Sequence, residues 1–231
     1  MDGSDARRVR LEPWGEGDFW VLQRNNTPEM TEHLGGPETA EQLVARHRRY
    51  VDLEPGRGQM YRVTLADTSG SGTSTGIPGT STGIPGTSTG IPGTSIGVPG
   101  TSTGIPGTST GIPGTSTGVP GDTVGSIGFW ERAWRDGTVW ETGWAMWPEF
   151  QGRGLAAAAA RAVAEAARAT GRNQYLHAFP GVDHPASNAV CRKAGFELLG
   201  PVEFEYPKGH WITSNDWRVD LSALRARGDV R

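Results

Sequence analysis

The chain has 231 residues, of which 35 are glycine and 16 are proline. Glycine lies far above the roughly 7% of an average globular chain, and this excess predicts a low-complexity segment rather than a uniform enrichment. Because 35% of the residues are hydrophobic and no apolar stretch approaches the roughly 18 residues of a spanning helix, the sequence excludes a helical membrane protein and favours a soluble core.

Net charge and cysteine content exclude further classes of protein. A formal net charge of −3 argues against a general nucleic-acid-binding protein. The single cysteine, Cys191, excludes an intramolecular disulfide framework and a cysteine-rich zinc site. Residues 1–10 carry charges but no apolar run, so we expect no secretory signal and a cytoplasmic location.

The first part of the chain predicts a strand, two helices and a second strand. We expect a short strand near residues 9–11 and a helix over about 16–25, followed by a loop. A second helix is expected over about 41–52, where apolar residues are set against arginines. Residues 60–65 then form a strand.

A heptapeptide repeat follows. Residues 72–120 are seven tandem units of the form G-T-S-T-G-I-P with minor variants. Each unit carries two glycines and a proline, and its single Ile or Val buries too little apolar surface to offset the entropy of ordering, so we expect a turn-rich disordered coil. We interpret residues 1–71 and 121–231 as one domain and 72–120 as an insertion in a hairpin loop; the alternatives are an elastic or adhesive spacer and a modification target.

The second part of the domain predicts alternating strands and helices. Strands are expected over 123–131 and 138–146, joined by the tight-turn signal Asp136-Gly137 and forming a meander with residues 60–65. The remaining expected elements are an alanine-rich helix over 155–170, a strand over 175–179, a helix over 185–194 and strands near 196–206 and 210–221. The predicted fold class is α/β (α+β), with a mixed, mostly antiparallel sheet flanked by helices.

The loop before the alanine-rich helix has the composition of an anion-binding site. Backbone N–H groups at a helix N-terminus favour anions, and glycines and a small alanine let phosphates approach. An ordinary strand-to-helix connection can have the same G-x-G pattern. The predicted pyrophosphate-binding residues are Gln151, Gly152, Arg153, Gly154, Leu155 and Ala156.

Two blocks of sequence resemble the GCN5-related N-acetyltransferase (GNAT) superfamily, in the branch similar to ribosomal-protein N-terminal acetyltransferases. The family's Q/R-x-x-G-x-G/A signature stands as Gln151 to Ala156, preceded by a strand and Pro148. Downstream, the stretch from Asn188 through Cys191 to Gly195-Phe196 is similar to the family's second motif.

This resemblance implies a sheet splayed open after the fourth strand, with acetyl-CoA as co-substrate and no metal. The pantetheine arm is expected to pair with the backbone near Met146 and Trp147, and the diphosphate to bind residues 151–156. Asn188 is expected to face the pantetheine arm or an ordered water; its alternative is a helix N-terminal cap.

The catalytic assignments are less specific. We favour Glu141 as general base, because strand alternation places it beside small residues that leave room for an acceptor; its alternative is a carboxylate paired with a neighbouring arginine. Cys191 stands where relatives carry a Ser or Tyr that protonates coenzyme A, and it is either that acid or a core residue. Glu32 and His33 are expected in the acceptor pocket. Glu131 is a further candidate for the general base.

The implied activity is acetyl transfer to a primary amine by direct attack on the thioester. The partner is an amine-bearing acceptor, with a protein N-terminal α-amine leading; a small cationic amine such as an aminoglycoside or polyamine, or a non-catalytic acyl-CoA-binding module, are the alternatives. His177 and His184 are expected to make simple polar contacts. The tryptophans between Trp130 and Trp147 are interpreted as hairpin core rather than as an acceptor-stacking surface.

Overall fold

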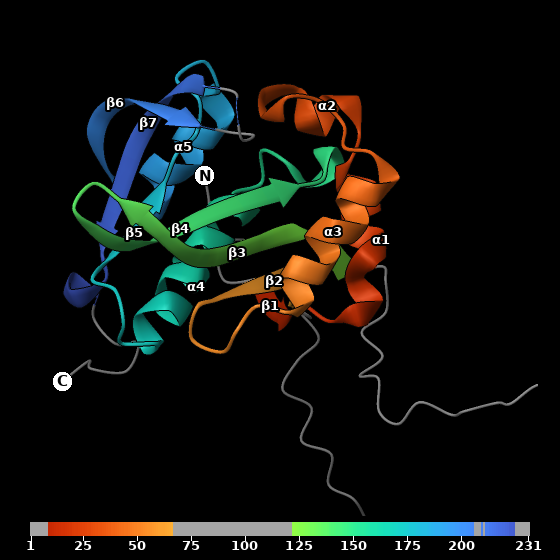
Figure 1. Cartoon of the computed structure of the whole chain (residues 1–231), viewed down its shortest axis with the longest axis horizontal. Helices are drawn as coiled ribbons and strands as arrows, with labels where there is room; N and C mark the ends of the chain where they lie inside the picture. Colours follow the sequence, from red (N-terminus) through yellow and green to blue (C-terminus); the bar gives the residue numbers. More distant parts are fainter. Residues whose placement is uncertain (1–8, 67–121, 206–208, 210, 225–231) are drawn as a thin grey trace, which may run out of the picture. The chain divides into compact units, whose positions relative to one another are not determined.

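The computed structural model describes residues 9–66, 122–205, 209 and 211–224 (Figure 1). The heptapeptide repeat over 72–120, predicted to be a disordered insertion, lies outside the described residues.

A single seven-stranded sheet organises the described part of the chain, in the order β1-β2-β3-β4-β5-β7-β6. Its neighbours pair antiparallel except for β4 and β5, which pair in parallel. The strands are β1 (Val9–Pro13), β2 (Gly58–Leu65), β3 (Thr123–Trp134), β4 (Gly137–Met146), β5 (Tyr175–Ala178), β6 (Glu197–Glu205) and β7 (Trp211–Asp220).

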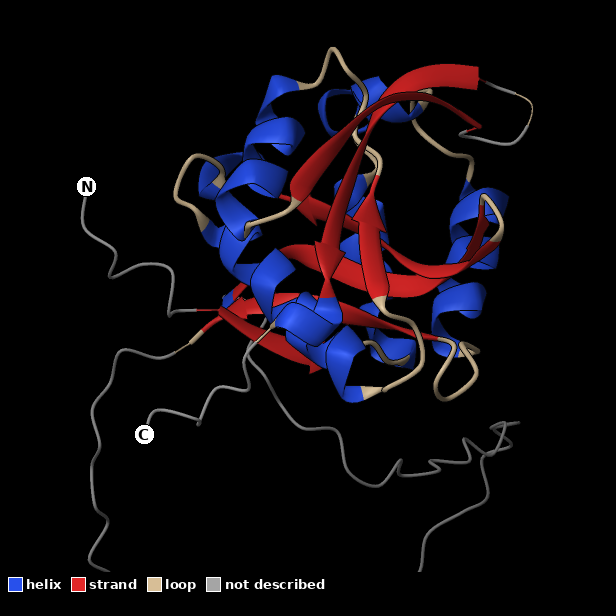
Figure 2. Cartoon of the chain, turned by 90° about the vertical axis from the view of Figure 1, so that its left-hand side faces the viewer, coloured by secondary structure: helices blue, strands red, loops and turns tan. Residues whose placement is uncertain are grey.

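Helices flank the strands on both sides (Figure 2). They are α1 (Phe19–Asn25), α2 (Pro28–Thr31), α3 (Ala40–Val51), α4 (Leu155–Ala169) and α5 (Pro185–Ala194), with short 3₁₀ turns η2 (Glu16–Asp18), η3 (Glu32–Leu34), η5 (Pro148–Phe150) and η6 (Leu221–Ala223). The predicted mixed α/β class is confirmed.

The segment around Glu32 and His33, predicted as a loop, instead forms the short helical pieces α2 and η3. Thr27 caps α2 by accepting a hydrogen bond from the Met30 N–H at 3.2 Å, and Pro28 occupies the first helical position, where its missing N–H costs nothing. The left-handed Gly35 then ends η3. A capping residue and a proline therefore outweigh the turn-forming glycines that suggested a loop.

Alanines let α4 pack closely on one face of the sheet. The side chains of Ala159, Ala160 and Ala164 are buried in a core cluster with Phe129 and Trp140 of the central strands. Small side chains bring the helix backbone near the sheet, so its N-terminus is held firmly beside the end of β4. Helix α5 in turn packs against α4 and β6.

The opposite face is covered by α1 and α3. A second core cluster joins Val21 and Leu22 of α1 and Leu43 of α3 to Met60 of β2 and to Trp147 just after β4. In Figure 1 these helices gather at the end of the sheet where β4 finishes, whereas β6 and β7 lie beside α5. The β4 end is thus bordered by two separate groups of elements.

The hairpin between β3 and β4 sets the register of the site. Trp134 pairs with Gly137, so the two-residue turn is Arg135-Asp136, one residue earlier than the predicted Asp136-Gly137 turn. Arg135 adopts a left-handed φ of 52°, as such hairpin turns require. The pairing then continues without a bulge and places Trp130 directly opposite Glu141.

Strands β4 and β5 separate soon after they meet. Their paired positions are Trp140 with Leu176 and Glu141 with His177. From Thr142 to Met146, β4 has no strand partner on that side among the described residues. The sheet is therefore splayed after its fourth strand, as the family resemblance implies.

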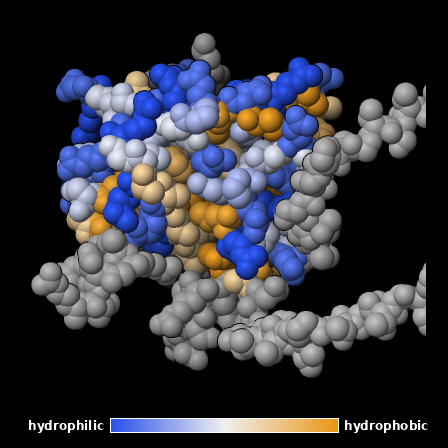
Figure 3. Space-filling view, turned by 90° about the horizontal axis from the view of Figure 1, so that it is seen from below, coloured by the Kyte–Doolittle hydropathy of each residue, from blue (hydrophilic) through white to orange (hydrophobic). Residues whose placement is uncertain are grey.

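The surface of the protein carries both hydrophilic and hydrophobic residues. The face shown in Figure 3 carries hydrophilic residues around a hydrophobic strip. None of the helices that the structure describes is long and apolar enough to span a bilayer.

Candidate active site

The predicted phosphate-binding loop lies exposed between β4 and α4. Gly152 and Gly154 have φ values of 72° and 79°, in the left-handed region that residues with a Cβ disfavour. A Cβ placed on either would meet nothing within 4 Å, so backbone conformation rather than crowding inside the protein calls for glycine.

The same loop presents unpaired backbone donors. The Ala158 N–H donates to the Gly154 carbonyl at 3.1 Å, and within the described part of the chain the N–H groups of residues 152–157 have no acceptor. They lie at the N-terminus of a 15-residue helix, whose dipole favours negative charge. The loop is therefore suited to an anion.

The splayed edge of β4 offers a second row of backbone groups. The Trp147 N–H donates to the Val124 carbonyl of the β3 side at 3.0 Å, and in an antiparallel pair alternate residues address the same neighbour. The N–H and C=O groups of Thr142, Trp144 and Met146 consequently point toward the splay. An extended ligand with amide groups can pair with this edge as an added strand does.

Trp147 itself is not available to such a ligand. Its N–H is used by Val124, its carbonyl accepts from the Phe150 N–H at 2.9 Å, and its indole is buried and donates to Asn25 Oδ1 at 2.9 Å. The Trp147 N–H is therefore not free for pantetheine, whereas the Met146 backbone faces the splay.

Gln151 links the loop to this edge. Its Nε2 donates to the Met146 carbonyl at 2.9 Å, so the side chain holds the start of the loop against the end of β4. We expected Gln151 to contact the cofactor; its side chain instead connects the two surfaces that the cofactor would use.

Glu141 lies on β4 beside the splay, on the face away from Trp140 and α4. It is 8% exposed, and its Oε2 accepts a hydrogen bond from the Arg132 Nη1 at 2.8 Å. Burial raises the pKa of Glu141 above its ordinary value, while Arg132, Trp130 and His177 act in the opposite direction. Proton affinity of this kind suits a general base better than that of an exposed glutamate.

The comparison with known families agrees with this geometry. Residues 111–197 match the family model of the acetyltransferase (GNAT) domain. This stretch of the chain is therefore similar to the GNAT acetyltransferase domain. GNAT enzymes take their acetyl group from acetyl-CoA, which agrees with the predicted co-substrate. No curated protein sequence matches the chain.

Several solved acetyltransferase structures share the fold of this chain at low sequence identity. An acetyltransferase from Agrobacterium tumefaciens str. C58 is 16% identical and covers 92% of this chain and 90% of its own, with a TM-score of 0.57. The aminoglycoside acetyltransferase AAC(6')-Ib with paromomycin and acetyl-CoA bound is 15% identical, with 96% and 98% covered and a TM-score of 0.58. The Salmonella typhimurium enzyme that modifies the N-terminal serine of 50S ribosomal subunit protein L7/L12 is 15% identical, with 92% and 95% covered and a TM-score of 0.57.

The Asn188 side chain is buried and fully hydrogen-bonded inside the fold. Its Nδ2 donates to the Gly181 and His184 carbonyls, and its Oδ1 accepts from Asn215 Nδ2 and Trp217 Nε1, all at 2.8 Å. Both amide hydrogens and both acceptor positions are used, so Asn188 has no capacity left for pantetheine. The helix cap is His184, so the alternative role is wrong as well. Asn188 instead joins α5 to β7.

Cys191 is a core residue. It has no exposed surface and lies in the cluster under α4. Burial raises the pKa of its thiol to about 12. A buried group that holds its proton this firmly is a poor donor to a departing thiolate, and we assign Cys191 to packing.

Glu32 and His33 lie on η3. The His33 ring stacks on His184 with centroids 4.1 Å apart, and its Nδ1 lies 3.9 Å from the Asp183 Oδ1. These contacts join η3 to the turn before α5 rather than to the β4 edge. His33 therefore connects the two groups of elements that border the end of β4, and a role of Glu32 and His33 in an acceptor pocket stays a prediction.

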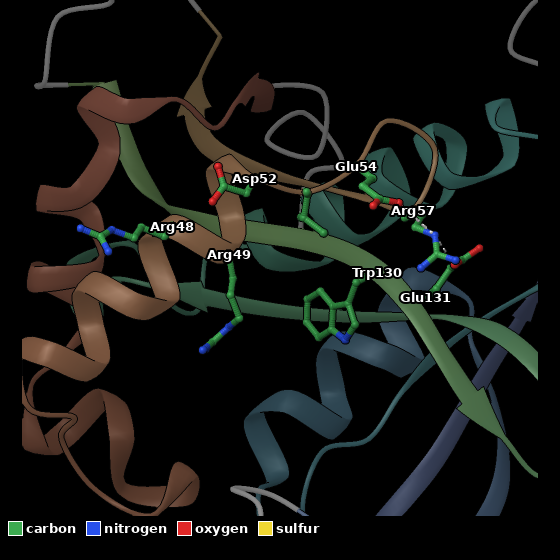
Figure 4. A pocket seen from close by; sticks show the side chains of 8 residues that line it. Arg48, Arg49, Asp52, Glu54, Arg57, Trp130 and Glu131 are labelled. Carbon is green, nitrogen blue, oxygen red and sulfur yellow. Dashed lines mark ion pairs between the residues drawn. The ribbon is translucent and has the colours of Figure 1, made fainter.

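A pocket of about 480 Å³ opens beside Trp130, on the strand position opposite Glu141. Figure 4 shows Arg57 directed toward Glu54 and Glu131, while Arg48 points away from the Trp130 ring. The residues that line the pocket are Arg48, Arg49, Asp52, Leu53, Glu54, Arg57, Trp130 and Glu131. The pocket thus carries equal numbers of cationic and anionic side chains around one aromatic ring.

Two residues near Glu141 were not singled out from the sequence. Arg132 shares a face with Glu141 by simple alternation along the β3–β4 hairpin, and that signal was present in the register. Asp216 is a fully buried acid in β7, and a lone carboxylate between Asn215 and Trp217 in a strand was the signal for it.

Proposed function

We propose that this protein transfers the acetyl group of acetyl-CoA to a primary amine, with a protein N-terminal α-amine as the leading acceptor. The observation that carries the proposal is the position of Glu141. A buried carboxylate of raised pKa stands at the last paired position of β4, where the strand begins to part from β5.

The donor is proposed to bind along the loop and the β4 edge. The free N–H groups of residues 152–157 would hold the diphosphate, and the backbone of Trp144 and Met146 would pair with the pantetheine amides. This arrangement brings the thioester toward the middle of β4, near Glu141.

The chemical step needs a neutral amine. An α-amine has a pKa near 8, so at neutral pH most of it is protonated, and Glu141 accepts that proton directly or through water. The nitrogen lone pair then attacks the thioester carbonyl, forming a C–N bond. When the C–S bond breaks, the proton that leaves the nitrogen passes to the sulfur and yields the amide and free thiol.

The charge of the pocket beside Trp130 favours a peptide over a polycationic acceptor. A polyamine or aminoglycoside binds best where carboxylates outnumber cations, whereas here Arg48, Arg49 and Arg57 balance the three acids. An α-amine also needs less help from the base than a lysine amine, whose pKa is near 10.4.

A pH profile of the Glu141→Gln variant tests the base. Glutamine keeps an oxygen for Arg132 but cannot accept the proton, so we expect kcat/KM to fall about 10²- to 10⁴-fold below the pKa of the amine and much less above it. Glu165→Gln is the matched control, because Glu165 also pairs with an arginine, Arg168, but lies on α4 outside the pocket and the β4 edge. An equal loss at every pH would assign Glu141 to binding or structure instead.

A further inference from the structure

A second buried acid–base pair adjoins Glu141. In the parallel pairing of β4 with β5, His177 is the residue in register with Glu141, so both side chains lie on the same face. On the next strand, Asp216 lies on that face as well, and the His177 Nδ1 is 2.6 Å from its Oδ1. His177 is 4% exposed and Asp216 is fully buried.

The hydrogen bond to Asp216 determines which ring nitrogen is basic. A carboxylate only accepts, so Nδ1 carries the hydrogen and donates it to Asp216. In the neutral ring the lone pair is therefore on Nε2. Stacking of the ring on Phe179, with centroids 5.8 Å apart, fixes its plane.

The other charged groups around His177 and Asp216 already have hydrogen-bond or ion-pair partners. Arg132 donates to Glu141, and Asp216 also accepts from Trp134 Nε1 at 3.2 Å and from Arg135 Nη2 at 3.4 Å. The remaining titratable groups that face His177 are Tyr175 on its own strand and Arg218, which is in register with His177 on β7 and pairs with Glu197.

We propose that His177, held by Asp216, is a positioning residue that takes over the proton which Glu141 removes from the acceptor amine. The inference rests on the proposed function, since it extends the proton path of that reaction by one residue.

Charge pairing explains why the proton would move. When Glu141 is protonated, Arg132 faces a neutral acid, and a partly buried cation that loses its charged partner is less stable. Transfer of the proton from Glu141 to Nε2 of His177 restores the Glu141 carboxylate beside Arg132. It also makes an imidazolium that donates from Nδ1 to the Asp216 carboxylate. Each buried carboxylate then has a cationic partner.

The first experiment compares three variants by steady-state kinetics between pH 6 and 9, with acetyl-CoA and an N-terminal peptide. In His177→Gln the amide can donate to Asp216 but cannot accept a proton. We expect kcat to fall about 10-fold or more, with the loss greatest at low pH and the KM for acetyl-CoA unchanged. The control is His47→Gln. His47 lies on α3 and accepts a hydrogen bond from Trp14, so this variant should retain the wild-type pH profile.

The double variant separates a relay from a structural role. If His177 acts through Glu141, the variant Glu141→Gln with His177→Gln is no slower than Glu141→Gln alone. Losses that multiply, with a pH profile of unchanged shape, would overturn the proposal. If Glu141→Gln is as active as the wild type, the proposed base itself is wrong; if Glu141→Gln is impaired and His177→Gln is not, only the relay is wrong.

Two further measurements test the relay if the His177→Gln variant fails to fold. Asp216→Asn keeps an oxygen for the Nδ1 hydrogen and removes the charge that supports the imidazolium, so it should reproduce the low-pH loss of kcat. Nitrogen NMR of the wild-type protein should show the neutral His177 ring protonated at Nδ1. A ring protonated at Nε2 would overturn the relay, because its proton acceptor would then face Asp216.

Discussion

Introducing a carboxylate into the loop before α4 gives a quantitative test of the phosphate-binding assignment. Gly154 has φ 79° and ψ 2°, and a Cβ there meets nothing within 4 Å. The Gly154→Glu variant should therefore fold, at a cost of roughly 1–2 kcal/mol for the left-handed backbone.

The effect on acetyl-CoA binding should be larger. If the new carboxylate lies about 5 Å from a diphosphate of two negative charges, Coulomb's law gives about 1.7 kcal/mol of repulsion at the dielectric constant of water and about 6.6 kcal/mol at an effective value near 20. These energies correspond to a Kd raised by about 15-fold to about 10⁵-fold. Added salt should reduce the difference, since the site is exposed.

Calorimetric titration with coenzyme A measures this change, and Gly171→Glu is the control. Gly171 also has a left-handed φ, 65°, and open space around its Cβ, but it follows the opposite end of α4. The control should lose a similar amount of thermal stability and bind coenzyme A normally. Equal affinities of the two variants would refute the assignment of the diphosphate to this loop.

Three other changes test the assignments of buried residues. Asn188→Ala removes four hydrogen bonds and leaves Trp217 Nε1 without its acceptor, so urea denaturation should show a loss of about 3–5 kcal/mol, whereas intact stability would contradict its role as a link. Cys191→Ala should leave kcat unchanged across pH and cost about 1 kcal/mol; a collapse of kcat in the folded variant would restore Cys191 as the acid. Burial lowers the pKa of His184, so the unfolded chain binds the proton first and the free energy of unfolding should fall as pH drops below about 6.5. His184→Gln should flatten that part of the stability curve, and an unchanged slope would contradict it.

The elements of the fold follow from local sequence signals. The turn signal near Asp136, the helix end at Gly195 and the alanine-rich run from Leu155 each lie within a residue or two of the observed boundary. The need for glycine at positions 152 and 154 also follows from the local sequence, because left-handed residues before a helix favour glycine for a backbone reason that does not depend on distant residues.

Side-chain partners that come from distant strands could not be read in the same way. Asn188 looked like a ligand or a cap, yet its four partners come from the preceding turn and from β7, and only the folded sheet brings Asn215 and Trp217 to it. Likewise, the acid beside His177 lies 39 positions further along the chain. Residue type and local spacing cannot distinguish a polar group facing substrate from one saturated by a remote strand.

Acetyl transfer itself is the most direct test of the account. Release of free thiol from acetyl-CoA should be measured with the full chain and a panel of acceptors: short peptides with a free N-terminus, the same peptides with the N-terminus blocked, a lysine side-chain amine, an aminoglycoside and a polyamine. We expect thiol release with the free N-terminal peptides, and acetylation at the α-amine by mass spectrometry. Binding of acetyl-CoA without thiol release from any amine would contradict the proposed function, and turnover with the aminoglycoside or polyamine alone would contradict the proposed acceptor.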